Sequence, residues 1–195
     1  MEIIEILKST KRYALNDRLI PDELKSRAKD LCYKYNNSLP SDKEGKQAIL
    51  KELLGTYNPL TFIEPNFYCD YGFNIHTSGL TVINHNCTIL DTSPIHIGKN
   101  VFIAPGVVIA CAGHSKDPIQ RAEGIMTSAP INIGDNVWIG ANVTINGGVN
   151  IGSGSIIGAG SVVTKDIPEN VIAIGVPCKV LRKVTQVDKE EILHI

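Results

Sequence analysis

Branched aliphatic residues recur at every sixth position through much of this chain. Isoleucine or valine occupies positions 97, 103 and 109, and the same step resumes at positions 133, 139, 145, 151, 157 and 163. Shorter runs of isoleucine and cysteine keep this step at positions 63, 69 and 75 and at positions 83 and 89. An amphipathic helix requires apolar residues three and four positions apart, so a period of six does not describe a helix.

A period of six fits very short strands separated by tight turns, in which one branched side chain per unit points inward. Small residues often follow the aliphatic position, as at Gly98 and Gly134. Asparagine tolerates the positive φ angles of tight turns and occurs at Asn100, Asn136 and Asn142. Hexapeptide repeats are typical of a parallel β-helix, so we predict a mainly β fold of that kind. A β-sandwich is the alternative, but sandwich strands recur less evenly.

Residues 1–60 carry a helical pattern instead and are expected to form a helical cap. The segment PDELKSRAKDLCYKY places apolar residues on one helical face, namely Leu24, Ala28, Leu31, Cys32 and Tyr35. A second helix is predicted to end at Gly55, with SDKE at 41–44 as its capping box. We expect the β-helix over residues 61–170 and a C-terminal tail over residues 171–195. A solenoid needs both ends covered, and these two segments can cover them.

The composition is that of a globular protein without a dominant charge. Of the 195 residues 43% are hydrophobic and 20% are charged, and the net charge is -1, which argues against nucleic acid or an anionic membrane as the main partner. The N-terminus lacks the apolar core of a signal peptide, and no run of about 18 apolar residues occurs, so a cytoplasmic protein is predicted. Five widely spaced cysteines without a C-x-x-C pair are expected to be reduced and buried. No zinc-type spacing is present, so the interpretation requires no metal.

The hexapeptide pattern stops at Ile109 and restarts at Ile133, which predicts a loop excursion over residues 110–132. This stretch contains His114, several charged residues and two prolines. Histidine titrates near neutral pH and therefore suits proton transfer. His114 is the first candidate for a catalytic residue, and an ordinary surface histidine is the alternative.

The chain resembles the sugar O-acetyltransferases of the galactoside, maltose and nodulation type, a branch of the hexapeptide-repeat acyltransferases. The matching stretches are YNNSLP (35–40), CDYGFNI (69–75), IGKNVFIAPGVVI (97–109), His114, and the long block from INIGDNVWIG to GVPCKV (131–180). The resemblance implies a left-handed parallel β-helix, a homotrimer with active sites between neighbouring subunits, acetyl-CoA as donor and a sugar hydroxyl as acceptor. The helices at the front favour the sugar branch over the antibiotic acetyltransferases.

His114 matches the catalytic histidine of that family. Moving an acetyl group from a thioester to an alcohol requires a base for the hydroxyl proton and donors for the oxyanion of the intermediate. The family transfers the acetyl group directly and has no required cysteine in this loop. Cys111 is therefore expected to pack in the interior, although a cysteine so close to a histidine also raises a covalent mechanism.

On the coenzyme side, the resemblance assigns residues to the pantetheine arm and to the phosphates. The residues matched to the arm are Ala141, Ala159, Thr164 and Lys165, and those matched to the phosphate end are Lys179 and Arg182. The galactoside branch has arginine at position 179, so lysine keeps the charge but loses the two-pronged hydrogen bonding. Trp138, the only tryptophan, is expected to project outward, where the family places it beside the coenzyme and a neighbouring subunit's histidine. Trimer packing alone is the other explanation for this tryptophan.

On the acceptor side, carboxylates and amides suit a polyol because hydroxyl groups both donate and accept hydrogen bonds. The residues matched to this site are Asp17, Asp70, Asn84, Asp91 and Met126. Asn16 aligns as well as Asp17 with the family's first aspartate. Asp91 stands one place before the second aspartate of the galactoside branch, where this chain has Thr92. These departures leave the identity of the sugar open.

Two other functions compete with a sugar O-acetyltransferase. One is an acetyltransferase that acts on an antibiotic, an amino sugar or another acceptor. The other is a hexapeptide-repeat scaffold without catalysis. The joint presence of His114, Trp138 and the coenzyme-lining block favours an enzyme, because a scaffold has no physical reason to keep them together.

Overall fold

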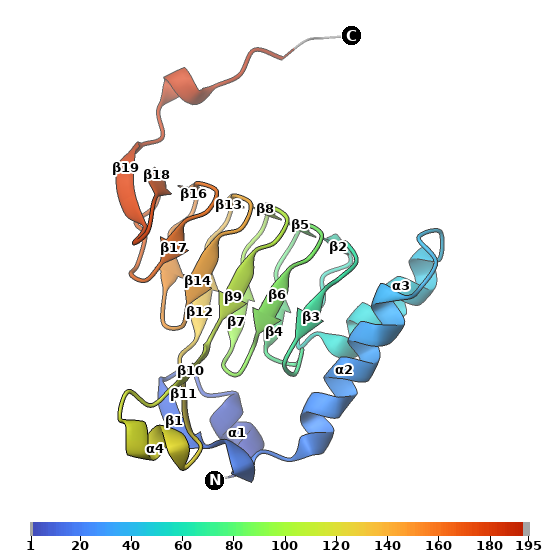
Figure 1. The fold of residues 1–195 in the computed structure, drawn as a ribbon. Coiled ribbons are helices and arrows are strands. Elements are labelled where there is room, and N and C mark those ends of the chain that lie inside the picture. Colours follow the sequence, from blue (N-terminus) through green and yellow to red (C-terminus); the bar gives the residue numbers. More distant parts are fainter. Residues whose placement is uncertain (1, 193–195) are drawn as a thin grey trace.

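Three sheets of short parallel strands wrap around one apolar core, and each turn of the chain around that core, or coil, adds one strand to each sheet (Figure 1). The computed structural model describes residues 2–192. The predicted mainly β fold, a parallel β-helix with helices at its N-terminal end, is confirmed.

The three sheets differ in length. The long sheet contains, in spatial order, β2 (Thr61–Ile63), β5 (Thr81–Ile83), β8 (Val101–Ile103), β13 (Trp138–Ile139), β16 (Ile156–Ile157), β18 (Val171–Ile174) and β19 (Lys179–Lys183). The five-stranded sheet contains β3 (Tyr68–Cys69), β6 (Thr88–Leu90), β9 (Val108–Ala110), β14 (Thr144–Asn146) and β17 (Val162–Val163). The four-stranded sheet contains β4 (Ile75–Thr77), β7 (Ile95–Ile97), β12 (Ile131–Ile133) and β15 (Asn150–Ile151). Within these three sheets, as described over residues 2–192, β19 alone runs antiparallel to its neighbour, β18.

The residues spaced six apart form the core. Each of the nine aliphatic residues from Ile97 to Val163 in this series is at most 3% exposed. Successive coils stack in register, so that Ile103 lies beside Ile139 and Ile139 beside Ile157. Burial of apolar surface at every coil is therefore the main stabilising contribution, at about 25 cal/mol per Å².

Asparagine residues make the turns, as predicted. Asn100, Asn136 and Asn142 have φ angles of 56°, 58° and 56°. The side-chain amide of Asn100 donates to the side-chain oxygen of Asn136 over 3.1 Å, so the turns of neighbouring coils are also linked. Left-handed backbone is tolerated by asparagine at little cost, which explains its repeated use here.

Helices cover the first coil. The N-terminal elements are α1 (Ile3–Leu7), β1 (Tyr13–Asn16), the short 3₁₀ helix η1 (Asp17–Leu19), α2 (Asp22–Asn36) and α3 (Lys43–Leu53). The predicted apolar face of α2 joins the solenoid core, with Leu24 packing instead in a smaller neighbouring cluster. The capping box predicted at 41–44 is wrong by one residue, because Asp42 is the N-cap and its carboxylate accepts the N–H of Gly45 at 2.9 Å.

The C-terminal segment continues the long sheet through β18 and β19 and ends in the 3₁₀ helix η2 (Gln186–Asp188). The last three residues of the tail predicted over 171–195 lie outside the described part of the chain. Within residues 2–192, no helix has both the length and the apolar character required to cross a membrane.

Candidate active site

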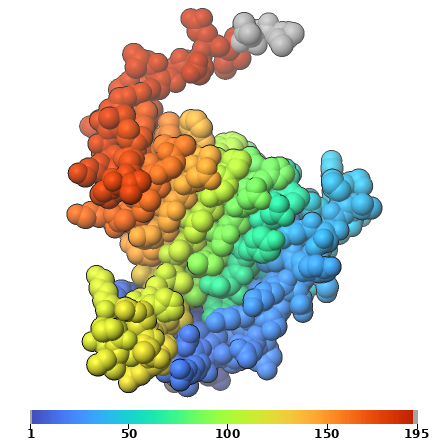
Figure 2. All heavy atoms as spheres, in the orientation of Figure 1, coloured from blue at the N-terminus to red at the C-terminus, as the bar shows by residue number. Residues whose placement is uncertain are grey.

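The chain leaves the solenoid after β9 and rejoins it at β12. The intervening residues 111–130, the excursion, form β10 (Ala112–His114), α4 (Pro118–Ala122) and β11 (Ile125–Ser128). Strand β11 pairs antiparallel with β10 on one side and with the N-terminal β1 on the other. Figure 1 shows this small sheet and α4 projecting from the coils, and in Figure 2 the atoms of the excursion (yellow) stand beside those of the N-terminal segment (blue). The predicted loop is therefore a folded hairpin that carries a helix.

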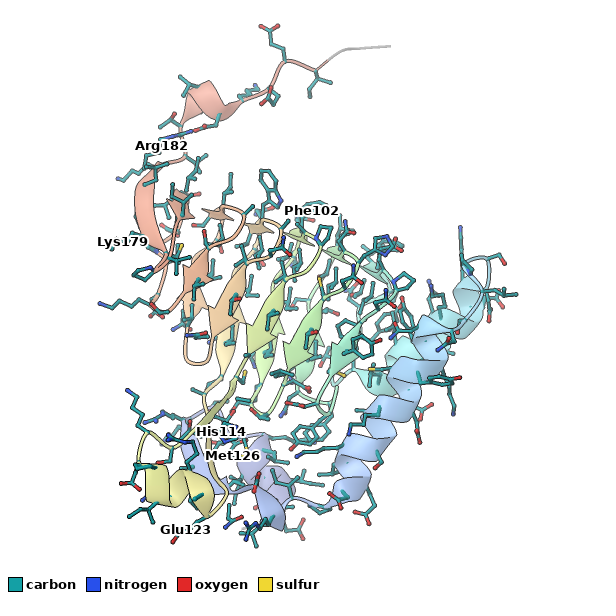
Figure 3. The ribbon with its side chains drawn as sticks, in the orientation of Figure 1. Phe102, His114, Glu123, Met126, Lys179 and Arg182 are labelled. Atoms are coloured by element: carbon teal, nitrogen blue, oxygen red, sulfur yellow. The ribbon has the colours of Figure 1, made fainter. Side chains whose placement is uncertain are left out.

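His114 ends β10, the edge strand of that sheet, and its side chain is exposed. Its register partner is Met126, which is also paired with Leu15 of β1. The Met126 side chain is 6% exposed and packs in an apolar cluster that includes Leu7 and Tyr71. The exposed imidazole thus sits on a strand whose neighbour is anchored in a core, which fixes its backbone position (Figure 3).

A network of buried hydroxyl groups joins the excursion to the second coil. The Ser128 hydroxyl lies 2.7 Å from the hydroxyl of Thr92 and 2.7 Å from that of Ser93. The phenol of Tyr13, on β1, donates to the backbone carbonyl of Thr92. Thr92, Ser93 and Ser128 are each at most 4% exposed. Buried hydroxyl groups that satisfy one another hold the two parts in one arrangement.

Asp91 is fully buried beside this network. One carboxylate oxygen accepts the backbone N–H groups of Asp70 at 3.0 Å and Tyr71 at 2.8 Å, and the other accepts that of Asn74 at 3.2 Å. Burial raises the pKa of Asp91 to about 7 despite these donors. The resemblance assigns Asp91 to the acceptor site, but the structure places it beneath the surface, where it holds the turn that carries Asp70.

Asp70 follows β3 and is half-buried. Burial raises the pKa of Asp70, and Lys25 and Lys29 on α2 act in the opposite direction. Its backbone is fixed by Asp91, so the carboxyl group has a defined position at the corner where the excursion leaves the coils. This makes Asp70 available for contact with a ligand in a way that Asp91 is not.

Asn16 and Asp17 differ in what their side chains do. The Asn16 side chain accepts the N–H of Arg18 at 3.1 Å and donates to the carbonyl of Glu123 at 2.9 Å. The backbone N–H of Asp17 donates to the carbonyl of Gly124 at 2.9 Å, so both residues adjoin the excursion. The amide of Asn16 is occupied by the backbone, whereas the carboxylate of Asp17 is half-exposed.

The remaining candidates lie at two different corners of the solenoid. Asn84, Ala141 and Ala159 follow β5, β13 and β16, so they share the corner between the long and five-stranded sheets. Thr164 and Lys165 follow β17, at the corner between the five- and four-stranded sheets from which the excursion also departs. Within one chain, His114 and the group formed by Asn84, Ala141 and Ala159 therefore lie at different places.

The outer surface of the long sheet is apolar. Neighbouring strands place a row of outward side chains in register, here named the apolar ladder: Phe62, Val82, Phe102, Trp138, Ile156 and Ile172. Trp138 is 53% exposed and Phe102 is 46% exposed, which confirms that the tryptophan points outward. In Figure 3, Phe102 and His114 lie on opposite sides of the coils. An exposed apolar row of this kind marks a contact surface.

Lys179 and Arg182 lie on β19, at the end of the long sheet (Figure 3). The Arg182 guanidinium makes a two-pronged contact with the carboxylate of Asp188 at 2.7 Å and 2.5 Å. That contact lowers the pKa of Asp188. A carboxylate of the same chain therefore occupies this exposed guanidinium, in the two-pronged geometry that arginine also uses for phosphate.

The cysteines are buried with free thiols, as predicted. Burial raises the pKa of Cys111 to about 12, so its thiolate is not populated near neutral pH. This argues against a covalent acetyl-cysteine and agrees with a packing role. Among residues 2–192, no three His, Cys, Asp or Glu side chains cluster as metal ligands would.

Two family descriptions match separate parts of the chain. Residues 21–58 match the maltose acetyltransferase hexapeptide capping motif, and residues 130–165 match the bacterial transferase hexapeptide (six repeats). A putative acetyltransferase of Saccharomyces cerevisiae is 51% identical over 170 residues, which cover 86% of this chain and 87% of that protein. The galactoside O-acetyltransferase of Escherichia coli is 47% identical over 167 residues, covering 86% of this chain and 82% of that protein.

Solved structures of similar proteins have the same fold as this chain. A maltose O-acetyltransferase from Clostridium difficile superimposes with a TM-score of 0.89 at 42% identity, covering 95% of this chain and 99% of that one. A galactoside acetyltransferase in complex with coenzyme A superimposes with a TM-score of 0.87 at 42% identity, covering 100% of this chain and 96% of that one.

Proposed function

Because this chain belongs to the galactoside and maltose O-acetyltransferase family and is an acetyl-CoA-dependent acetyltransferase, we propose that it acetylates a hydroxyl group of a sugar with His114 as general base. The observation that carries this proposal is the placement of His114, exposed on the edge strand of a hairpin that is anchored to the coils. An exposed histidine does not contribute to packing. A role in binding or catalysis therefore explains better why a folded hairpin presents it.

The chemistry requires one proton to move twice. A ring nitrogen of His114 accepts the proton of the acceptor hydroxyl while its oxygen attacks the thioester carbonyl. The carbon–sulfur bond then breaks, and the imidazolium returns the proton to the leaving thiolate, giving an acetyl ester and a free thiol. General base catalysis of this kind contributes roughly 10²- to 10⁴-fold in rate.

We propose a homotrimer with active sites shared between subunits. The support is that the excursion and the corner of Asn84, Ala141 and Ala159 are separate in one chain, so a second chain is required to complete a site. The apolar ladder, which includes Trp138, offers the surface for that contact. In this arrangement His114 of one subunit meets Trp138 of the next.

For the coenzyme, we propose that the small residues Ala141 and Ala159 line the pantetheine arm. Glycines flank both residues, at positions 140, 158 and 160, so a narrow chain can approach the backbone there. Thr164 and Lys165 are exposed at the other corner of the five-stranded sheet, and we assign them to the arm by the family match alone. Lys179 and Arg182 meet the phosphate end, since both are exposed cations on the last strand. The galactoside acetyltransferase structure similar to this chain holds coenzyme A.

For the acceptor, we propose Asp17, Asp70 and Asn84 as the residues that contact the sugar. Asp17 is preferred to Asn16 because the side chain of Asn16 already caps the turn. Asp91 and Met126 are buried and do not contact the sugar in this proposal. Asp91 holds the backbone of Asp70, and Met126 pairs with His114.

A thiol-release assay tests the proposal. The protein is mixed with acetyl-CoA and a panel of galactosides, maltose, glucose and an aminoglycoside, and free thiol is followed over time. His114→Ala should lower the rate with the best sugar by roughly 10²- to 10⁴-fold without changing the melting temperature. Lys116→Ala, an exposed change in the same excursion, should keep the wild-type rate. Full activity of His114→Ala would contradict the assignment of His114 as general base. A preference for the aminoglycoside would contradict a simple sugar as the acceptor.

A further inference from the structure

A second group of basic side chains lies away from His114, on the outer surface of the four-stranded sheet. His76 on β4 and His96 on β7 are register partners, and their rings stack with centroids 4.8 Å apart and planes 17° apart. Together with Lys8 and Thr10 of the N-terminal segment they line a hollow of about 500 Å³. The hollow combines residues from four separate parts of the chain, because Leu54 and Gly55 also line it.

The hollow contains cationic groups and no carboxylate. Its complete lining is Lys8, Thr10, Leu54, Gly55, Phe73, Asn74, His76, Pro94 and His96. The ammonium of Lys8 lies 5.5 Å from the centre of the Phe73 ring, which holds that cation at the wall of the hollow. Lys8 and His96 are exposed and His76 is half-buried, and no carboxylate in the lining pairs with them. Basic groups that face a hollow without a carboxylate attract a ligand of negative charge.

The charged surroundings of His76 can be followed element by element. Lys8 approaches from the end of α1 and His96 from β7, and the turn after α3 contributes only the Thr56 hydroxyl, 3.0 Å from Nδ1 of His76. Asp91 lies behind the hollow and is held by backbone N–H groups, including that of Asn74. Burial, and after it His96 and Lys8, lower the pKa of His76. Neighbouring cations thus oppose protonation of this ring, and a bound anion would relieve that repulsion.

We propose that this hollow is a binding site for a phosphate-type oxyanion, either free phosphate or the phosphomonoester of a small metabolite, held by Lys8, His76 and His96. The Thr10 hydroxyl is a further donor on the rim. Protonated imidazoles and an ammonium donate charge-assisted hydrogen bonds, the type that phosphate oxygens accept best. The site lies on the four-stranded sheet, whereas the apolar ladder lies on the long sheet, so the proposed subunit contact does not involve it.

Binding at this site should depend on pH. Protonation of His76 adds positive charge next to Lys8, so the affinity for an anion of constant charge should rise as the pH falls from 8 to 5.5. By linkage, the bound anion should raise the pKa of His76. Neither effect involves acetyl transfer, so this inference stands or fails independently of the proposed function.

The test is a titration of the full-length protein followed by the NMR signals of the histidine ring protons, without coenzyme. Inorganic phosphate and glycerol 3-phosphate are added in separate arms at constant ionic strength, and sodium chloride is the third arm. We expect saturable shifts of His76 and His96 with either phosphate ligand, and the dissociation constant for the phosphate dianion should be at least tenfold lower at pH 6 than at pH 8, since phosphate itself takes up a proton in this range. Equal affinity for inorganic phosphate and glycerol 3-phosphate identifies the oxyanion itself as the ligand. Tighter binding of glycerol 3-phosphate identifies the phosphomonoester of a metabolite.

Variants separate a built site from general charge attraction. Lys8→Gln and His96→Gln should each weaken phosphate binding about tenfold. Lys116→Gln and His85→Gln, which alter exposed basic side chains elsewhere, should bind as the wild type does. Shifts that do not saturate, equal shifts with chloride, or unchanged binding by His96→Gln would each overturn the proposal.

Discussion

The hydroxyl oxygen of Ser128, in the excursion, lies 2.7 Å from the hydroxyl oxygen of Thr92, in the second coil. This contact joins two segments 36 residues apart in the sequence at a fully buried position. The hydroxyl of Ser93 lies at the same distance from that of Ser128, so two hydroxyl contacts link the hairpin that carries His114 to the coils. The position of the imidazole therefore depends on residues that take no part in proton transfer.

Ser128→Ala should both destabilise the protein and slow the enzyme. It leaves the hydroxyls of Thr92 and Ser93 buried without this partner, which costs about 1–3 kcal/mol. Urea unfolding measures that loss, and thiol release should show a reduced kcat because the hairpin is held less firmly. Ser41→Ala, at an exposed serine, is the matched control and should change neither quantity. Wild-type stability of Ser128→Ala would show that the network does not anchor the excursion.

Asp91 should make the protein less stable as the pH rises. Its pKa is raised to about 7 in the folded state, against about 3.9 in an unfolded chain. The folded state therefore binds the extra proton between these values, so its contribution is complete below about pH 4 and falls until about pH 7, by roughly 4 kcal/mol in all. Asp91→Asn removes this contribution. Urea unfolding at pH 4.5 and pH 8 should show the wild type losing stability relative to the variant, and a constant difference would contradict the raised pKa.

Phe102→Glu should dissociate the proposed trimer. The change puts a charge at the centre of the apolar ladder, where burial against another subunit would leave it unpaired. Sedimentation velocity should report a single chain in place of three, and thiol release should be lost with it. Asn132→Glu adds the same charge to an exposed position of the four-stranded sheet and should leave the assembly intact. An unchanged mass for Phe102→Glu would place the subunit contact elsewhere.

Arg182→Gln should weaken coenzyme binding without slowing the chemical step. The guanidinium already grips the carboxylate of Asp188 in the way it would grip a phosphate, and loss of that fork should raise the KM for acetyl-CoA about tenfold. The kcat should stay within about twofold, because Arg182 is remote from His114 (Figure 3). With acetyl-CoA that lacks its 3′-phosphate, wild type and variant should have similar KM values. Equal KM values with intact acetyl-CoA would remove Arg182 from the site.

The regular part of the fold follows from local sequence because each coil repeats a local pattern. Ile103 and Ile139 occupy equivalent places in their hexapeptides and are register partners in the structure. Asn136 adopts positive φ at the turn where its residue type predicts it. The helix N-cap at Asp42 differs from the prediction by one residue, because serine and aspartate are both good caps and stand next to each other.

The candidate site depended on contacts that local sequence does not encode. Strand β1 pairs with β11 more than 100 residues later, and no periodic signal announces a single pairing of that kind. The burial of Asp91 follows from the turn that wraps around it, whereas its sequence position alone suggests a surface carboxylate.

The sequence by itself determined that stacked hexapeptide coils would form, that they would be interrupted between Ile109 and Ile133, and that His114 would stand in the interruption. Only the tertiary structure decided that the interruption folds as a hairpin against β1 and that Asp91 and Met126 point inward. It also decided that Phe102, the register partner of Trp138, lies on the opposite side of the coils from His114. The physical reason is the sequence separation of the contacts. A hexapeptide satisfies its own turn and its neighbouring coil, whereas a site assembled from distant segments is specified only by where those segments pack.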